Sequence, residues 1–145
     1  KVKTKSAAVL WSDQIYLTEN TINKSIQKFR KNNSLFTFPI FYKKKPYVKV
    51  FLDKKKNFLD IVQTRETNKK IRFGYTDCGF FLFDTNFVKK NLIKLIKKKI
   101  IISKKTNEID FLKSFYYINK IEKIDLTKAS SYKDTIGINF LEDIL

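Results

Sequence analysis

Two polar residues near opposite ends of the chain could hold a cation. Asp13 directly follows the apolar run 7–11, and Asn139 follows Gly137. Ligands of open α/β sheets bind beyond the carboxyl ends of strands, and Mg²⁺ takes one or two protein oxygens and fills its other positions with phosphate and water. The two residues are therefore candidate Mg²⁺ ligands. Each also has a simpler interpretation, Asp13 as a turn or capping residue and Asn139 as a helix N-cap.

Further carboxylates could recognise a sugar. Glu66 and Asp77 bracket a segment that contains Gly74, and Glu108 precedes an apolar helical pattern. Ionised carboxylates accept hydrogen bonds, so they can bind sugar hydroxyls. The alternatives are surface charges that balance the lysines and, for Glu108, a favourable position at the positive end of a helix dipole.

The composition excludes several kinds of chemistry. The 145 residues fit about one domain, contain no histidine, and contain one cysteine, Cys78. Catalytic triads and histidine metal sites are thus absent from this chain, an internal disulfide is impossible, and a reducing, cytoplasmic location is expected. No apolar run reaches the ~20 residues that span a bilayer, so we expect no membrane partner.

The formal net charge of +17 would attract polyanions. The lysines are spread along the whole chain, however, and no RNA-binding motif accompanies them. Residues 43–45 lie beside Tyr42 and Tyr47, a combination that could stack bases, but the signal is weak. We therefore expect mainly solvated lysine faces and do not expect nucleic acid as a partner.

Strand-like and helix-like segments follow one another along the sequence. Strands are expected at residues 7–11, 36–42, 47–52, 58–64, 80–83 and 121–126, and helices at 18–33, 86–100, 107–119 and 140–145. Thr18 is the expected N-cap of the first helix, and Asp84 begins the segment 84–86 that is expected to cap the second. The pair at 47–52 and 58–64 is typical of a β-hairpin. The alternation predicts an α/β fold with a mixed, mostly parallel sheet flanked by helices, in which the hairpin is an insertion.

Taken in order, short segments along nearly the whole chain resemble the sugar-1-phosphate nucleotidyltransferases and the broader MobA-like transferases, which have a glycosyltransferase-A-like, Rossmann-like fold. The segments are Val-Leu-Trp-Ser-Asp-Gln at 9–14 with Leu-Thr-Glu-Asn-Thr-Ile at 17–22, Thr-Phe-Pro at 37–39 with Pro-Tyr-Val at 46–48, Arg-Glu-Thr-Asn at 65–68 with Gly-Tyr-Thr-Asp-Cys-Gly at 74–79, Asn-Glu at 107–108, and Thr-Ile-Gly-Ile-Asn at 135–139 with Leu-Glu-Asp at 141–143.

The resemblance implies Mg²⁺-dependent transfer of a nucleotide from a nucleoside triphosphate to a sugar-1-phosphate. It makes Asp13 and Asn139 the catalytic metal ligands. It also places sugar contacts in one middle region, with Glu108 nearby. The residues of that region that match are Glu66, Thr76, Asp77 and Gly79.

Two departures from the family pattern affect this expectation. Ser12 stands where the family has a glycine before the metal-binding Asp, and the glycine-rich triphosphate loop with its Arg and Lys would precede Lys1. Residues 1–145 are accordingly expected to form one partial nucleotidyltransferase domain with little activity alone, associating with a missing N-terminal half or with itself. The alternatives are a noncatalytic sugar-nucleotide-binding or assembly module and a basic nucleic-acid-binding domain.

Overall fold

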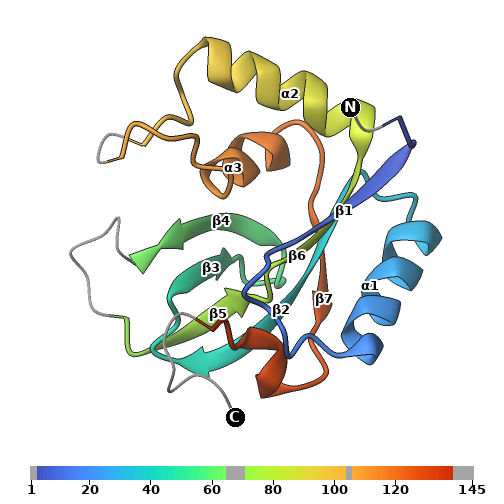
Figure 1. The fold of residues 1–145 in the computed structure, drawn as a ribbon, viewed down its shortest axis with the longest axis vertical. Helices are drawn as coiled ribbons and strands as arrows, with labels where there is room; N and C mark the ends of the chain where they lie inside the picture. Colours follow the sequence, from blue (N-terminus) through green and yellow to red (C-terminus); the bar gives the residue numbers. More distant parts are fainter. Residues whose placement is uncertain (1–2, 65–70, 104–105, 139–145) are drawn as a thin grey trace.

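The computed structural model describes residues 3–64, 71–103 and 106–138. A curled sheet of seven strands has helices on both of its faces (Figure 1). The elements in chain order are β1 (Ser6–Leu10), α1 (Glu19–Lys31), β2 (Phe36–Lys44), β3 (Val48–Leu52), β4 (Phe58–Gln63), β5 (Phe73–Asp77), β6 (Phe80–Asp84), α2 (Thr85–Lys97), α3 (Lys113–Asn119), β7 (Asp125–Lys128) and the 3₁₀ helix η2 (Tyr132–Thr135).

The sheet is mainly antiparallel, so the expected mostly parallel, Rossmann-like sheet is wrong. Its strand order is β1-β6-β2-β5-β3-β4, and β7 also pairs with β2. Among the described residues, the β2–β7 pair is the parallel one, and all other strand pairs are antiparallel. No helix of the described residues separates β2 from β6. Short connections permit antiparallel neighbours, whereas a parallel pair needs a crossover of a dozen or more residues. The predicted hairpin is present as β3 and β4.

A two-residue bulge lies between β5 and β6, which pair with the same edge of β2. Ile40 pairs with Asp77 of β5, and Thr37 pairs with Leu82 of β6. Between these pairs β2 advances three residues while the opposite side advances five, so two residues are extra. Both β5 and β6 lie on the same edge, because β7 pairs with Thr37–Ile40 on the other. Bulges of this kind redirect side chains and often lie next to active sites.

A cluster of aromatic rings holds α3 against the sheet. Phe36 and Phe38 project from one face of β2, and their side chains are almost completely buried. Phe115 of α3 packs edge-on against Phe36, with ring centroids 4.6 Å apart, and against Phe81 of β6, 5.2 Å apart. Burial of such rings is a major contribution to the stability of a small domain, and this core fixes the sheet that carries the site.

The first helix packs through small polar side chains on the opposite face of the sheet. The Thr18 hydroxyl accepts a hydrogen bond from the Thr21 N–H, which confirms Thr18 as the predicted N-cap. Thr21 and Ser25 are completely buried, and the Ser25 and Thr127 hydroxyls are hydrogen-bonded at 2.9 Å. Thr127 alternates with Leu126, which packs on the core, so α1 and α3 cover different faces.

The second helix begins at its predicted cap, and the third begins later than expected. Asp84 accepts a hydrogen bond of 2.8 Å from the Phe87 N–H at the start of α2. The helix predicted over 107–119 exists only as Lys113–Asn119. Asn107 has a φ of 58°, and Ile102 pairs with Ile109 in an isolated bridge. These features hold the preceding segment in a turn, and the helix predicted at 140–145 lies outside the described residues.

The helices are short compared with the thickness of a bilayer. Both α1 and α2 have 13 residues, and α3 has seven. A membrane-spanning helix needs ~20 mostly apolar residues. Within the described parts of the chain, no helix is long and apolar enough to cross a membrane.

Candidate active site

The bulge between β5 and β6 forms the centre of the candidate site. The Gly79 N–H donates to Oδ2 of Asp77 at 2.9 Å, and the Gly79 carbonyl accepts from the Trp11 N–H at 2.9 Å. Gly79 has a φ of +63°, and a Cβ there would lie 2.5 Å from Cγ of Gln14. Only glycine suits this conformation and close approach. The bulge therefore fits tightly against the loop that follows β1.

The last described segment lies beside the same loop. The Ile138 N–H donates to the Asp13 carbonyl at 3.0 Å. A Cβ on Gly137 would lie 2.7 Å from Oδ2 of Asp13 and 2.8 Å from Nε2 of Gln14. The loop that follows β1 and the segment at Gly137, which are far apart in sequence, thus meet at the half-buried Asp13 carboxylate.

Burial and nearby charges shift the pKa of Asp77, whose side chain is 6% exposed. Burial raises the pKa of Asp77 to about 6, and the nearby Asp13 carboxylate adds to this rise. The Gly79 N–H and the Lys43 ammonium act in the opposite direction, because both favour the carboxylate. Lys43 also donates to the Thr135 carbonyl at 3.3 Å. The site consequently combines a carboxyl group of raised pKa with the nearby Lys43 side chain.

Asp134 fixes the turn that leads to Gly137. Its buried carboxylate accepts hydrogen bonds from the Thr18 N–H at 2.6 Å, the Thr21 hydroxyl at 2.7 Å and the Ser131 N–H at 2.8 Å. Burial acts to raise the pKa of Asp134, but these hydrogen bonds outweigh it, so the pKa is lowered. Asp134 was not predicted from the sequence, although Ser131 and Asp134 have the spacing of a capping box.

The predicted site residues fall into four groups. Asp13, Asp77 and Gly79 lie together at the bulge. Thr76 is buried and, by strand alternation, points to the opposite face from Asp77. Glu108 borders a neighbouring pocket. The remaining two predictions, Glu66 and Asn139, lie outside the described residues.

Oxygen atoms at this site suit a hard cation. Oε1 of Gln14 is buried and has no hydrogen-bond partner among the described residues. Nε2 of the same side-chain amide lies beside Gly137, as does the Asp13 carboxylate. Within the described ranges, no group of three His, Cys, Asp or Glu side chains could hold a metal. One carboxylate with neutral oxygens nevertheless fits Mg²⁺, which takes few protein ligands when phosphates bind it too.

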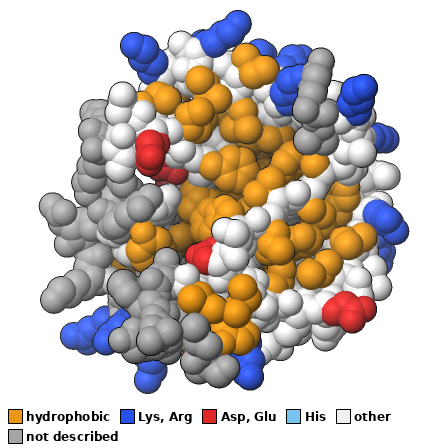
Figure 2. All heavy atoms as spheres, in the orientation of Figure 1, with side chains coloured by type: hydrophobic (Ala, Val, Ile, Leu, Met, Phe, Trp, Pro, Cys, Tyr) orange, Lys and Arg blue, Asp and Glu red, His pale blue; other side chains and the backbone are white. Residues whose placement is uncertain are grey.

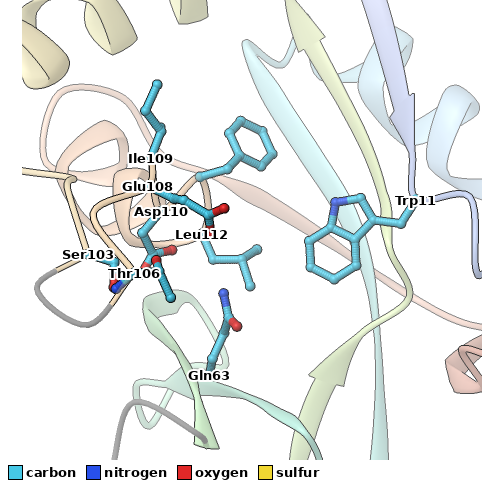
Figure 3. A pocket seen from close by; sticks show the side chains of 9 residues that line it. Trp11, Gln63, Ser103, Thr106, Glu108, Ile109, Asp110 and Leu112 are labelled. Atoms are coloured by element: carbon cyan, nitrogen blue, oxygen red, sulfur yellow. The ribbon is translucent and has the colours of Figure 1, made fainter. Parts of the chain in front are cut away.

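A small pocket of about 180 Å³ lies beside the bulge (Figure 3). The Trp11 indole enters it from one side, and Gln63, Leu112 and Asp110 face it from the other. Ser103 and Glu108 add polar groups.

Trp11 connects the pocket to the site. It stands two residues before Asp13 in sequence, and its backbone N–H donates a hydrogen bond to the Gly79 carbonyl. Trp11 and Gln63 were not predicted as site residues, because an apolar ring and a neutral amide in the sequence do not by themselves indicate chemistry.

On the face of the molecule seen in Figure 2, hydrophobic and basic side chains occupy different areas. Hydrophobic side chains gather over its middle, and Lys and Arg side chains surround them. The exposed hydrophobic residues include Leu10 and Ile15, which flank the Asp13 loop, and Ile109 at the pocket. The site thus has exposed apolar side chains beside it.

Neither a protein-family model nor a curated protein matches this chain. Support for a function must therefore come from the site itself. Its distinctive elements are a bulge with a titrating acid, a second acid against a glycine turn, and a pocket that begins at Trp11.

Cys78 in the bulge is expected to be unreactive in the folded protein. Its side chain is completely buried; burial raises the pKa of the thiol, and the Asp77 and Asp134 carboxylates raise it further. The thiolate is the reactive form, so a thiol reagent such as DTNB should react at least about 100-fold more slowly with the native protein than with protein in guanidinium chloride. Equal rates would contradict this burial, and Cys78→Ser should abolish the signal because the chain has no other cysteine.

Proposed function

We propose that this chain provides the metal- and acceptor-binding side of a site for nucleotidyl transfer to a sugar-1-phosphate. The observation that carries the proposal is the contact of the Asp13 carboxylate with Gly137, since these residues are far apart in sequence. Gly137 begins the Gly-Ile-Asn segment whose last residue is the candidate ligand Asn139. Convergence of an acid and this segment is what a shared Mg²⁺ would require.

The donor set supports Mg²⁺ as the ion. In the proposal Asp13 and Asn139 are its ligands, and the unpartnered Gln14 Oε1 offers a third oxygen nearby. When bound, Mg²⁺ would bridge phosphate oxygens and offset the negative charge that develops during transfer. Lys43 lies close enough to influence Asp77 and would add positive charge on the same side.

The pocket at Trp11 is the proposed place for the sugar. Gln63, Ser103, Glu108 and Asp110 border it, so hydroxyl groups of a sugar would find donors and acceptors. Indole rings give an apolar surface on which the carbon face of a sugar can pack. Glu66, three residues after Gln63 in sequence, remains a predicted contact of the same ligand.

The reaction implied is an in-line displacement. An oxygen of the sugar-1-phosphate forms a bond to the α-phosphorus of the nucleoside triphosphate. The bond from that phosphorus to its bridging oxygen breaks, and pyrophosphate leaves with the electron pair. The chain's own residues would contribute position and charge, not covalent chemistry. A cytoplasmic location stays part of the proposal, and the single, free cysteine supports it.

Metal binding tests the proposal directly. We expect Mn²⁺, used as a paramagnetic probe in the presence of a panel of sugar nucleotides, to bind at least about tenfold more weakly to Asp13→Asn and to Asn139→Ala than to the original chain. The measurement is electron paramagnetic resonance of free Mn²⁺, with circular dichroism as a check on folding. Glu122→Gln, which alters an exposed carboxylate, serves as the control.

Two outcomes would contradict nucleotidyl transfer. One is Mn²⁺ affinity that neither substitution changes. The other is tight binding of a sugar nucleotide that needs neither the metal nor Asp13, which would instead support the noncatalytic binding module.

A further inference from the structure

A second groove on the sheet has a different character from the pocket at Trp11. It measures about 520 Å³ and shares no described lining residue with that pocket. Ile40, Tyr42, Tyr75 and Leu126 form its floor, and Lys56 and Lys128 border it. The groove therefore joins four separate parts of the sequence: β2, the β3–β4 hairpin, β5 and β7.

Exposed aromatic rings continue the floor of this groove. Tyr42 pairs with Tyr75, and Lys44 pairs with Phe73, so all four side chains lie on one face of the sheet. The side chains of Tyr42 and Phe73 are 56% and 48% exposed. Their rings are nearly parallel, at 7°, with centroids 6.5 Å apart, and Tyr75 meets Tyr42 edge-on at 5.2 Å. The two exposed rings are therefore parallel and accessible, so the planar rings of a ligand can stack on them.

The charge around these rings is positive. Lys44 Nζ lies 5.9 Å from the centre of the Phe73 ring. Among the described residues that line the groove there are two lysines, Lys56 and Lys128, and no carboxylate. The nearest acid in the hairpin, Asp53, is held by the N–H groups of Lys55 and Asn57. A ligand that suits this surface carries both negative charge and flat rings.

We propose that this groove binds single-stranded nucleic acid without sequence preference. Bases would stack on Tyr42 and Phe73, while phosphates would contact Lys44, Lys56 and Lys128; rings combined with a basic groove are how such proteins hold single strands. The bases of a duplex stack on one another and do not expose their faces, and an acidic peptide has no planar bases to stack on the two parallel rings. From the sequence we did not expect nucleic acid, because the lysines are dispersed; the fold is what brings these three together.

Fluorescence anisotropy with a labelled 15-nucleotide oligo-dT tests this proposal. The double variant Tyr42→Ala/Phe73→Ala should bind at least about tenfold more weakly, through loss of stacking. Lys56→Glu/Lys128→Glu should also weaken binding and should reduce the slope of log affinity against log salt by roughly one to two. Both pairs are exposed, so the fold should tolerate these changes.

Matched controls separate a local site from general charge. Lys89→Glu/Lys90→Glu changes the net charge by the same amount on the exposed side of α2, and Tyr47→Ala removes an exposed ring outside the groove. Both should leave binding nearly unchanged. The proposal is overturned if the two lysine pairs have equal effects, if removal of both rings has none, or if a 15-base-pair duplex or poly-glutamate binds as tightly as the single strand.

Discussion

Replacing Phe115 with alanine is expected to lower the free energy of unfolding by about 3–5 kcal/mol. Phe115 is completely buried, and its ring lies within 4.6–5.5 Å, centroid to centroid, of Phe36, Phe38, Phe81 and Phe111. Its removal would leave a cavity between α3 and the sheet. Urea denaturation measures the change, and the thermal midpoint should fall by roughly 10 °C or more.

Two further variants keep this prediction testable. Phe115→Leu should still fold and should lose a smaller part of the stability, about 1–2 kcal/mol, because most of the volume remains. Phe73→Ala removes the same side chain from a half-exposed position and should cost less than about 1 kcal/mol. Similar losses for Phe73→Ala and Phe115→Ala would show that α3 does not depend on this aromatic core.

Replacing Asp77 with asparagine should remove a pH dependence of stability amounting to about 3 kcal/mol. The pKa of Asp77 is raised from 3.8 to about 6 in the folded state. The folded protein therefore keeps this proton after the unfolded chain has lost it. The stabilisation is complete below pH ~4 and is lost as the pH rises through about 6. Asparagine has no such proton and can still accept the Gly79 N–H through its side-chain oxygen.

The measurement is the difference in unfolding free energy between Asp77→Asn and the original chain, followed from pH 4 to pH 7. This difference should move in favour of the variant as the pH rises. Comparing the two proteins cancels the opposite contribution of Asp134, whose lowered pKa stabilises the fold above acid pH. Glu122→Gln, at an exposed position, should show no comparable trend. Parallel pH curves for Asp77→Asn and the original chain would contradict a buried, titrating Asp77.

Local sequence patterns were enough for many of the elements but not for the sheet. Thr18 and Asp84 mark helix starts correctly because a cap is a contact between near neighbours in sequence. The strand β5 (Phe73–Asp77) was missed because Gly74 and Asp77 are poor strand formers. Its partners are β2 and β3, and tertiary pairing overrides this local preference. Strand direction also depends on which strands meet, and alternation of segments alone does not determine it.

The site shows the same division between local and distant information. Asp13, Asp77 and Gly79 were proposed from residue type and resemblance, and they do lie together. Asp134 and Lys43 were not proposed, since their roles depend on contacts across the fold. The hydrogen bond from the Thr18 N–H to Asp134 joins residues 116 positions apart. A pattern read over a short window has no access to such a pair.

The number of extra residues between β5 and β6 constrains how this chain can change in length. Because the insertion is even, Phe81 and Phe83 keep the same inward orientation as Tyr75 relative to β2. Deleting one residue there would turn Leu82 inward and Phe81 towards α1, because side chains alternate along a strand. Deleting both residues would preserve the inward and outward alternation of the side chains but would remove the bulge in which the Gly79 N–H binds Asp77. In related sequences we therefore expect deletions at this position to remove both extra residues or neither.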